Sequence, residues 1–478
     1  MMKTLELLPQ PNDDNNDNNR LETQRMLYLQ HVRSGLEYAS SSWSPWISNS
    51  SMNRIQRVQN SALRSIAGLS KTCPQDFLHL ETGIEPIQDR FQKNDMITWD
   101  NYARLPPEDS RRQLIEKKVP PRLKTRQGWR HKTAKLMTRF DYKRAPKGKI
   151  APPWKQANIN LEAVELEKKK SEYTEDELNR RAIEKITELR KDVEIYTDGS
   201  TSGRQEKGGA GVFIRNSDGE TISEESIAAG AICSSYTAEA RALSKALDWI
   251  ANNQERDSLI ITDSMSLFSA LRSNDWRDTD PILAEIKEKL QNIESRPTLL
   301  WVPSHCRIPG NDRADKLADM GTKLSQKEVP VTGKITRARI KREKWGVRHD
   351  RAARTFKDKR QPRTHIEMKW PRKVRSLYAR LRSGHSKELG YYSWLIEKQD
   401  DPSCKCGAEK ETIEHVIAEC PLLDEDRRNL DMTNAKLETL VKDPEASRKL
   451  LMTRFPGLQV RDENSIEAGG TSQTNAQC

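Results

Sequence analysis

The sequence holds 478 residues, in which 82 Lys and Arg outnumber 70 Asp and Glu and give a formal net charge of +12. This length predicts two to four domains. The basic balance favours a polyanionic partner, nucleic acid first, although a lysine-rich solvated surface would give the same charge. The seven Cys are few and odd in number, which argues against a disulfide scaffold. No apolar run approaches membrane-spanning length and the N-terminus lacks a secretory signal. We therefore expect an intracellular protein without a membrane partner, in the nucleus or the cytoplasm.

The first 102 residues divide into two parts. Residues 1–22 are rich in Asn and Asp and predict a disordered leader. Residues 23–102 carry apolar residues at helical spacing, and the run from Met52 to Ile66 predicts an amphipathic helix that ends near Gly68. A plain helical bundle would explain this pattern.

The same region contains the sequence motifs LEYASSSWSPW, IQRVQNSALRSIAG and LETGIEPI. They resemble the segment that follows the polymerase palm in reverse transcriptases of non-LTR, LINE-like retrotransposons. The resemblance implies that the chain corresponds to the C-terminal portion of an element polyprotein. No aromatic-x-Asp-Asp motif of a polymerase palm occurs in the sequence, so we expect no polymerase activity from this chain.

Two basic segments flank the central part of the chain. Residues 103–190 predict a basic linker and a charged helix, and residues 326–400 predict a basic helical region. In the first segment the cations are interleaved with Trp129, Phe140 and Tyr142, a mixture that suits phosphate contact and base stacking. RNA or DNA is thus an expected partner of these segments, although a solvated linker would have a similar composition.

Four acidic residues in the central part lie at the ends of predicted strands or within predicted helices. A β-prone run from Val193 leads to Asp198, and a second apolar run leads to Asp263. Glu239 lies early in a strong helix signal, and Asp315 lies in a later one. Carboxylates bind hard divalent cations, and two such cations can activate water and stabilise the leaving oxygen of a phosphodiester. A helix cap or a solvated charge would explain each acid alone, but the four together predict a two-metal site.

The motifs around these acids are T-D-G-S, T-A-E-A, T-D-S and V-P-S-H followed by G-N-D-R-A-D. In this order they resemble ribonuclease H type 1 over residues 191–325. The resemblance implies an α/β ribonuclease H-like fold, with a mixed five-stranded sheet flanked by helices. It also implies endonucleolytic hydrolysis of the RNA strand of RNA/DNA hybrids with two Mg²⁺ ions. A catalytically inactive nucleic-acid-binding remnant is the alternative, and T-A-E-A and G-N-D-R-A-D disfavour a transposase or integrase.

The resemblance assigns a role to each site residue. Asp198 would bind both metals, and Asp315 would bind the metal that activates water. Glu239 and Asp263 would bind the metal at the leaving group. His305 would aid proton transfer or product release. The positions expected to contact the substrate are Gly199, Ser200, Ser234, Ser235 and Ser264.

Two features depart from the family pattern. Tyr236 and Met265 stand where many members carry Gln, which weakens the expected reading of the minor groove. Residues 274–281 are too short for the basic protrusion with which some members grip the hybrid. The flanking basic segments are expected to supply that grip.

The C-terminal part contains a cluster of metal-binding residue types. Cys404, Cys406, His415 and Cys420 offer three thiolates and one imidazole, a normal set for tetrahedral Zn²⁺. Their order resembles the zinc knuckle at the end of many non-LTR elements, although the one-residue spacing of the first pair is tight. We expect a CCHC zinc knuckle at residues 401–425 that binds RNA or DNA, and a helical segment with a polar tail at 426–478. A helical hairpin with incidental cysteines is the alternative.

Overall fold

The computed structural model describes residues 20–117, 127–147, 158–203, 207–253, 257–273, 280–357, 370–398 and 401–459. Nearly all of the predicted leader and much of the polar tail lie outside these ranges. The chain divides into two compact units, Asp95–Ile340 and Met1–Asn94 with Lys341–Cys478, each described by itself below. In the parts that the structure describes, no helix combines the length and the apolar character needed to cross a membrane.

The unit Asp95–Ile340 is built on a six-stranded mixed sheet with the order β1-β6-β5-β2-β3-β4. The strands β2, β3 and β4 are antiparallel neighbours, whereas β1, β6, β5 and β2 run parallel. The predicted sheet had five strands; the sixth is β1, which pairs with β6 from within the segment predicted as linker and charged helix. The strands are β1 (Asn160–Ala163), β2 (Val193–Thr201), β3 (Gly208–Asn216), β4 (Thr221–Gly230), β5 (Ser258–Thr262) and β6 (Thr298–Trp301).

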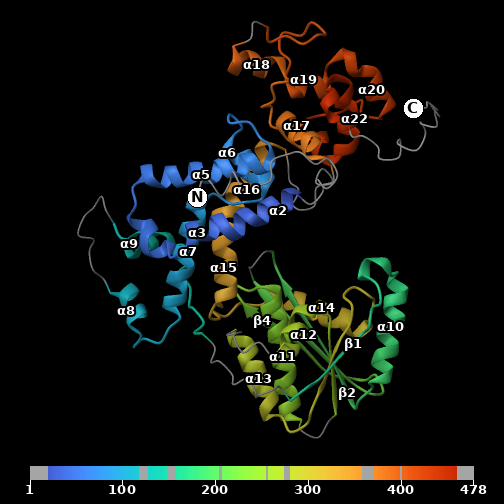
Figure 1. Cartoon of the computed structure of the whole chain (residues 1–478). Helices are drawn as coiled ribbons and strands as arrows, with labels where there is room; N and C mark the ends of the chain where they lie inside the picture. The colour runs from blue at the N-terminus through green and yellow to red at the C-terminus, as the bar shows by residue number, and fades with distance from the viewer. Residues whose placement is uncertain are drawn as a thin grey trace, which may run out of the picture. The chain divides into compact units, whose positions relative to one another are not determined.

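Helices cover both faces of this sheet. On one face α11 (Ser235–Asn252), α12 (Met265–Arg272) and α13 (Pro281–Asn292) pack against Ile195 and Ile260. On the other face α10 (Glu175–Glu188) and α14 (Pro309–Lys323) pack against Tyr196, Leu259 and Ile261. Neighbouring residues along a strand point to opposite faces, so the apolar run Leu259–Ile261 of β5 contributes to the cores on both faces of the sheet. Figure 1 shows α10 on the opposite side of the strands from α11 and α13.

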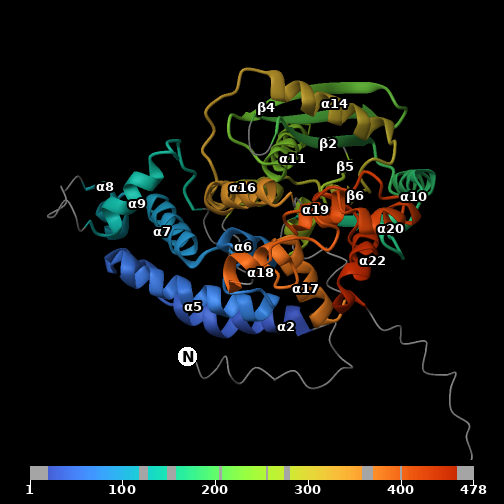
Figure 2. The same ribbon diagram turned by 90° about the horizontal axis from the view of Figure 1, so that it is seen from above.

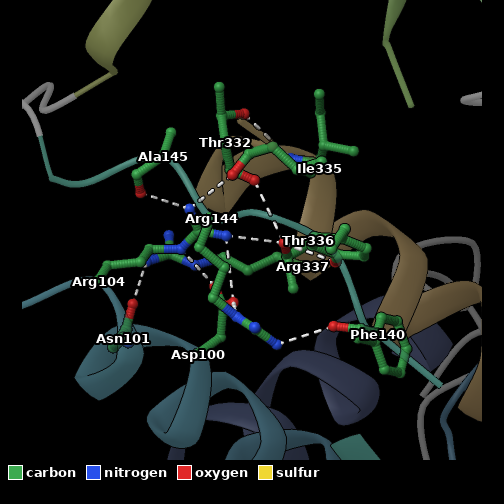
Figure 3. A network of polar contacts seen from close by, with 12 residues as sticks. Asp100, Asn101, Arg104, Phe140, Arg144, Ala145, Thr332, Ile335, Thr336 and Arg337 are labelled. Carbon is green, nitrogen blue, oxygen red and sulfur yellow. Dashed lines mark hydrogen bonds and ion pairs between the residues drawn. The ribbon is translucent and has the colours of Figure 1, made fainter. Parts of the chain in front are cut away.

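The same unit contains a buried ion pair that joins three segments of the chain (Figure 3). Arg104 follows α7 (Ile87–Ala103) and donates to both Asp100 oxygens, at 2.7 and 3.1 Å. It also donates to the carbonyls of Ala145 and Val331 and to Thr336 Oγ1 in α15 (Gly333–Lys341). All five guanidinium N–H groups are therefore used inside the protein. Arg144 binds Asp100 as well, at 3.0 Å. Arg104 and Arg144, two cations of the first basic segment, therefore stabilise the fold through contacts inside the protein.

The other unit is helical and has separate apolar cores. One core joins α5 (Asn49–Ala67) and α6 (Gln75–Thr82), and α5 ends at Gly68, whose φ of 65° is easy only for Gly. A second core gathers residues of α17 (Arg372–Arg382), α19 (Ile413–Ala418) and α22 (Pro444–Arg454), which lie together in Figure 2. The remaining helices include α2 (Arg20–Leu27), α3 (Ser34–Glu37), α4 (Ser40–Trp43), α16 (Val347–Thr355), α18 (Gly390–Glu397), α20 (Asp424–Asn429) and α21 (Thr439–Lys442), with α8 (Ser110–Glu116) and α9 (Trp129–Met137) in the sheet-containing unit.

Candidate active site

Two acids reach the same edge of the sheet because their strands are parallel neighbours. In the β2–β5 pair the last partners are Thr197 and Thr262. Asp198 and Asp263 are the next residues of the two strands, so the register places them side by side at the carboxyl end of β5. Asp198 is only 7% exposed. The sheet register therefore brings the two acids together, although β2 does not end at Asp198 as predicted but continues to Thr201, because it pairs with β3 to that residue.

A third acid comes from α11, which begins after Ser234. The Ser234 side chain accepts a hydrogen bond from the Thr237 backbone N–H and caps the helix. Glu239 lies one turn further on, and its carboxylate comes within 4.8 Å of those of Asp198 and Asp263. A set of three carboxylates at this spacing could hold divalent cations.

Gly199 allows α11 to come this close to β2. A Cβ atom at Gly199 would lie 2.1 Å from the Glu239 backbone nitrogen and 2.5 Å from the Ala238 carbonyl carbon. Real contacts of this kind are longer than 3.0 Å, so a side chain at position 199 would force the backbone of α11 to move away from β2. The tight packing of Gly199 thus positions Glu239.

We expect Gly199→Ala to lower the free energy of unfolding by about 3 kcal/mol, the upper end for overpacking. Hybrid cleavage should fall as well, because the displaced helix carries Glu239. Urea unfolding of the whole chain measures the first effect. Ser200→Ala is the matched control for stability, since the described hydrogen bond that it removes, from Ser200 Oγ to Asp319 Oδ1, is exposed. Equal stability of the two variants would contradict the role given to Gly199.

The fourth predicted acid, Asp315, lies on α14 at the exposed rim of this group. It is close enough to Asp198 for its negative charge to raise the pKa of the Asp198 carboxyl. Helix α14 packs tightly on β3, where Cβ atoms at Gly209 and Gly211 would lie 2.0 and 2.1 Å from helix carbonyl oxygens. Three of the predicted acids, Asp198, Glu239 and Asp263, thus form a tight group, and the exposed Asp315 lies near Asp198 outside it.

The electrostatics of the group favour a cation. Burial, followed by the charges of Asp263 and Asp315, raises the pKa of Asp198 to about 7. Burial raises the pKa of Glu239 well above its usual value, and Asp198 adds to the rise. Glu239 Oε2 is shielded from solvent and has no hydrogen-bond partner among the described residues. Such an oxygen is costly unless it has a partner, and the hard oxygen donors of this group fit Mg²⁺.

The predicted His305 lies in an exposed loop between β6 and α14. Burial raises the pKa of Asp263, and the nearby His305 and Lys170 lower it, in that order. His305 and Arg307 both have left-handed backbones, with φ of 56° and 55°. This conformation costs roughly 1–2 kcal/mol for a residue other than Gly, so the surrounding contacts must hold the loop.

Comparisons with known proteins agree with this arrangement. The profile of the family described as RNase H matches residues 190–323. A ribonuclease H of Rhizobium etli is 31% identical over 152 residues, which are 30% of this chain and 99% of that protein. The chain belongs to the ribonuclease H family. The predicted family and the predicted ribonuclease H-like fold are thereby confirmed.

Two further similarities are to a retrotransposon polyprotein and to a solved structure that contains an RNA/DNA hybrid. The chain is 24% identical over 239 residues to a retrovirus-related Pol polyprotein from the type-1 retrotransposable element R1 of Popillia japonica, which covers 45% of this chain and 90% of that protein. A solved structure of LC11-RNase H1 in complex with an RNA/DNA hybrid is 27% identical and covers 27% of this chain and 96% of that one, with a TM-score of 0.24. The expected resemblance to retrotransposon proteins therefore agrees with the similarity to this polyprotein.

The serines predicted to contact substrate are partly engaged within the ribonuclease H domain. Ser234 caps α11, and Ser264 caps α12 by accepting from the Leu267 backbone N–H. Ser200 donates to Asp319, whereas Ser235 is exposed. Substrate contact by these residues stays a prediction. Residues 274–279, where the basic protrusion of some ribonucleases H is expected to be missing, lie outside the described residues.

Sequence reasoning did not single out the residues that surround the His305 loop of the ribonuclease H domain. Lys170 lies in a short 3-10 helix (Lys170–Glu172), and Asn179 lies in α10. The available signal was the apolar spacing of Leu178, Ala182 and Ile186, which recur every four residues and indicate a packed amphipathic helix.

The C-terminal cysteine and histidine residues also converge, outside the ribonuclease H domain. The ligand atoms of Cys404, Cys406, His415 and Cys420 all lie within 4.8 Å of one another. The Cys404 and Cys420 sulfur atoms are 3.8 Å apart, the separation that tetrahedral bonds of about 2.3 Å from one Zn²⁺ would give. His415 Nε2 lies 3.2 Å from the Cys406 sulfur. The tight spacing is made feasible by a turn in which the Gly407 N–H donates to the Cys404 carbonyl.

The surroundings of this cluster suit a structural metal. His415 Nδ1 lies 3.6 Å from a Glu419 oxygen, so the nitrogen that does not face the thiols has an acidic neighbour, as metal-binding His residues commonly do. A hydrogen bond from the Ala408 backbone is the largest influence that lowers the pKa of Cys406, to about 7. The lowered pKa favours the Cys406 thiolate, which is the form that binds zinc, whereas burial raises the pKa of the Cys404 and Cys420 thiols.

Proposed function

We propose that this protein cleaves the RNA strand of RNA/DNA hybrids by endonucleolytic hydrolysis, leaving a 5′-phosphate and a 3′-hydroxyl. The observation that carries the proposal is the convergence of Asp198, Glu239 and Asp263 at one strand edge of a ribonuclease H domain. The buried Glu239 oxygen without a described partner supports a bound cation there.

The residues of the site take complementary parts in this proposal. Asp198 lies centrally and would bind two Mg²⁺ ions, with Asp315 on one side and Glu239 and Asp263 on the other. Bound magnesium supplies a lowered pKa for the attacking water and stabilisation of the leaving oxygen. The exposed His305 would carry a proton to or from solvent, because an imidazole can both accept and donate a proton.

The test is cleavage of a labelled hybrid by the whole purified chain with Mg²⁺. We expect cuts in the RNA strand of the hybrid, none in duplex DNA of the same sequence, and none after chelation of the metal. Cleavage of duplex DNA instead would support a transposase or integrase. Binding of the hybrid without cleavage by a folded, metal-supplied protein would support the inactive remnant and overturn the proposed activity.

The C-terminal cluster is proposed to hold one Zn²⁺ through Cys404, Cys406, His415 and Cys420. Four protein ligands leave no position for a substrate, so the site would be structural. Like other small zinc modules on basic proteins, it would present backbone and cationic groups to RNA or DNA. The distance of 3.8 Å between two of its sulfur atoms supports the shared metal.

The origin of the chain is proposed to be a non-LTR retrotransposon, on the strength of its similarity to the R1 polyprotein. Polymerase activity is not part of the proposal, since the sequence has no aromatic-x-Asp-Asp motif. Basic segments are proposed to contact nucleic-acid phosphates. Because Arg104 and Arg144 are held by Asp100, that contact would fall to exposed cations such as Lys143.

A further inference from the structure

The ribonuclease H domain of this chain includes a segment that precedes the family match. The match begins at residue 190, yet β1 pairs with β6 in parallel from Asn160 to Ala163. Helix α10 then packs Leu178, Ala182 and Ile186 into the core that also contains Cys306 and Ile308. Figure 1 shows α10 alongside the sheet. Residues 158–188 are therefore part of the folded domain and lie against the loop that carries His305.

Two side chains of this segment hold the loop on either side of His305. Lys170 Nζ donates to the Ser304 carbonyl at 2.7 Å and to Ser304 Oγ at 2.6 Å. Asn179 Nδ2 donates to the Cys306 carbonyl at 2.7 Å and to the Arg307 carbonyl at 3.0 Å. The residues before and after His305 are thus bound by polar groups from 127 to 134 positions earlier in the chain.

The backbone of the loop explains why such contacts matter. His305 and Arg307 both have positive φ, which residues with a Cβ adopt only when neighbouring contacts fix it. An additional ion pair joins Arg307 to Glu175 at the start of α10.

We propose that Lys170 and Asn179 are positioning residues that fix the His305 loop beside the acidic group. The proposal rests on the proposed hybrid cleavage. Neither side chain contacts the reacting atoms in this role. Both act through the loop backbone, and a misplacement of about 1 Å in a reacting group can lower a rate by about 100-fold.

The test compares Lys170→Met and Asn179→Asp in the whole chain. Asp matches the size of Asn but has no N–H to donate and would face two carbonyl oxygens. For each variant we expect kcat on a hybrid to fall by about 10- to 100-fold, with KM changed less than about threefold. Lys170→Arg, which keeps the charge and the donors, should retain most of the rate. Lys169→Met is the matched control, because Lys169 is also exposed and no described contact joins it to the loop.

A double-mutant cycle separates positioning from general support of the fold. If Lys170 acts through the loop, Lys170→Met combined with His305→Ala should be no slower than His305→Ala alone, since the two losses are shared. Multiplicative losses, or wild-type kcat in both Lys170→Met and Asn179→Asp, would overturn the proposal.

Hydrogen exchange provides a readout that does not depend on catalysis. Lys170→Met and Asn179→Asp should speed exchange of the amides of residues 304–308 while leaving β2 and β5 protected. Unchanged exchange in the loop would overturn the proposal even if the protein cuts hybrids. Faster exchange in a protein that does not cut would support the loop contact and reject only the proposed function.

Discussion

Asp198→Asn is expected to abolish hybrid cleavage in an otherwise folded protein. Asn keeps the size of the side chain but removes the charge that two divalent cations would share. The loss in kcat should be on the order of 10³–10⁴-fold, as for other residues that a reaction cannot bypass. Single-turnover cleavage of a labelled hybrid with saturating Mg²⁺ measures it.

The same substitution should raise the stability of the metal-free protein above neutral pH. The folded domain holds the Asp198 proton to about pH 7, whereas an unfolded Asp releases it near pH 4. The folded state therefore binds more protons between these values, and its stability falls as pH rises through that window. Asp198→Asn removes this dependence, so thermal unfolding at pH 8 without metal should occur at a higher temperature in the variant than in the wild type.

The matched control is Asp218→Asn. Asp218 is exposed and lies in the turn between β3 and β4. It should cleave at the wild-type rate and show the wild-type pH dependence. Addition of Mg²⁺ should stabilise the wild type and Asp218→Asn more than Asp198→Asn. An Asp198→Asn protein that cuts hybrids at the normal rate would refute the assignment of the acids.

Cys406→Ser is expected to release zinc and unfold the module around it. The purified chain should contain one zinc per molecule, and a strong chelator should remove it. Structural zinc contributes on the order of 10 kcal/mol of folding free energy in small modules. Because Ile413, Val416 and Ile417 of the neighbouring α19 belong to the core shared by α17 and α22, loss of the metal should disorder that core as well.

Elemental analysis and thermal unfolding followed by circular dichroism measure this prediction. Lys405→Ser is the control, since Lys405 lies between the first two cysteines but is exposed and offers no ligand. It should retain zinc and unfold like the wild type. A chain purified without chelator that holds no zinc would show that the four residues meet without a metal.

Local features of this protein were readable from its sequence because they depend on neighbouring residues. The alternating and apolar runs that end at Asp198 and Asp263 predicted strands, and the structure has β2 and β5 there. The helix predicted to end near Gly68 ends at that residue, because a left-handed cap favours Gly. The family motifs named four acids, and the structure brings three of them within 4.8 Å.

Only the tertiary structure decided which distant segments meet. The contact between Lys170 and Ser304 spans 134 positions, and no local pattern specifies a pair at that separation. It depends on β1 joining the sheet next to β6, which adds a strand to a segment predicted as a basic linker and a charged helix, and packs that helix against the sheet. Likewise, Arg104 belongs to a segment predicted as a basic linker, but in the structure it is buried and paired with the buried Asp100. Side-chain partners of this kind follow from strand register and helix packing, which the whole chain sets together.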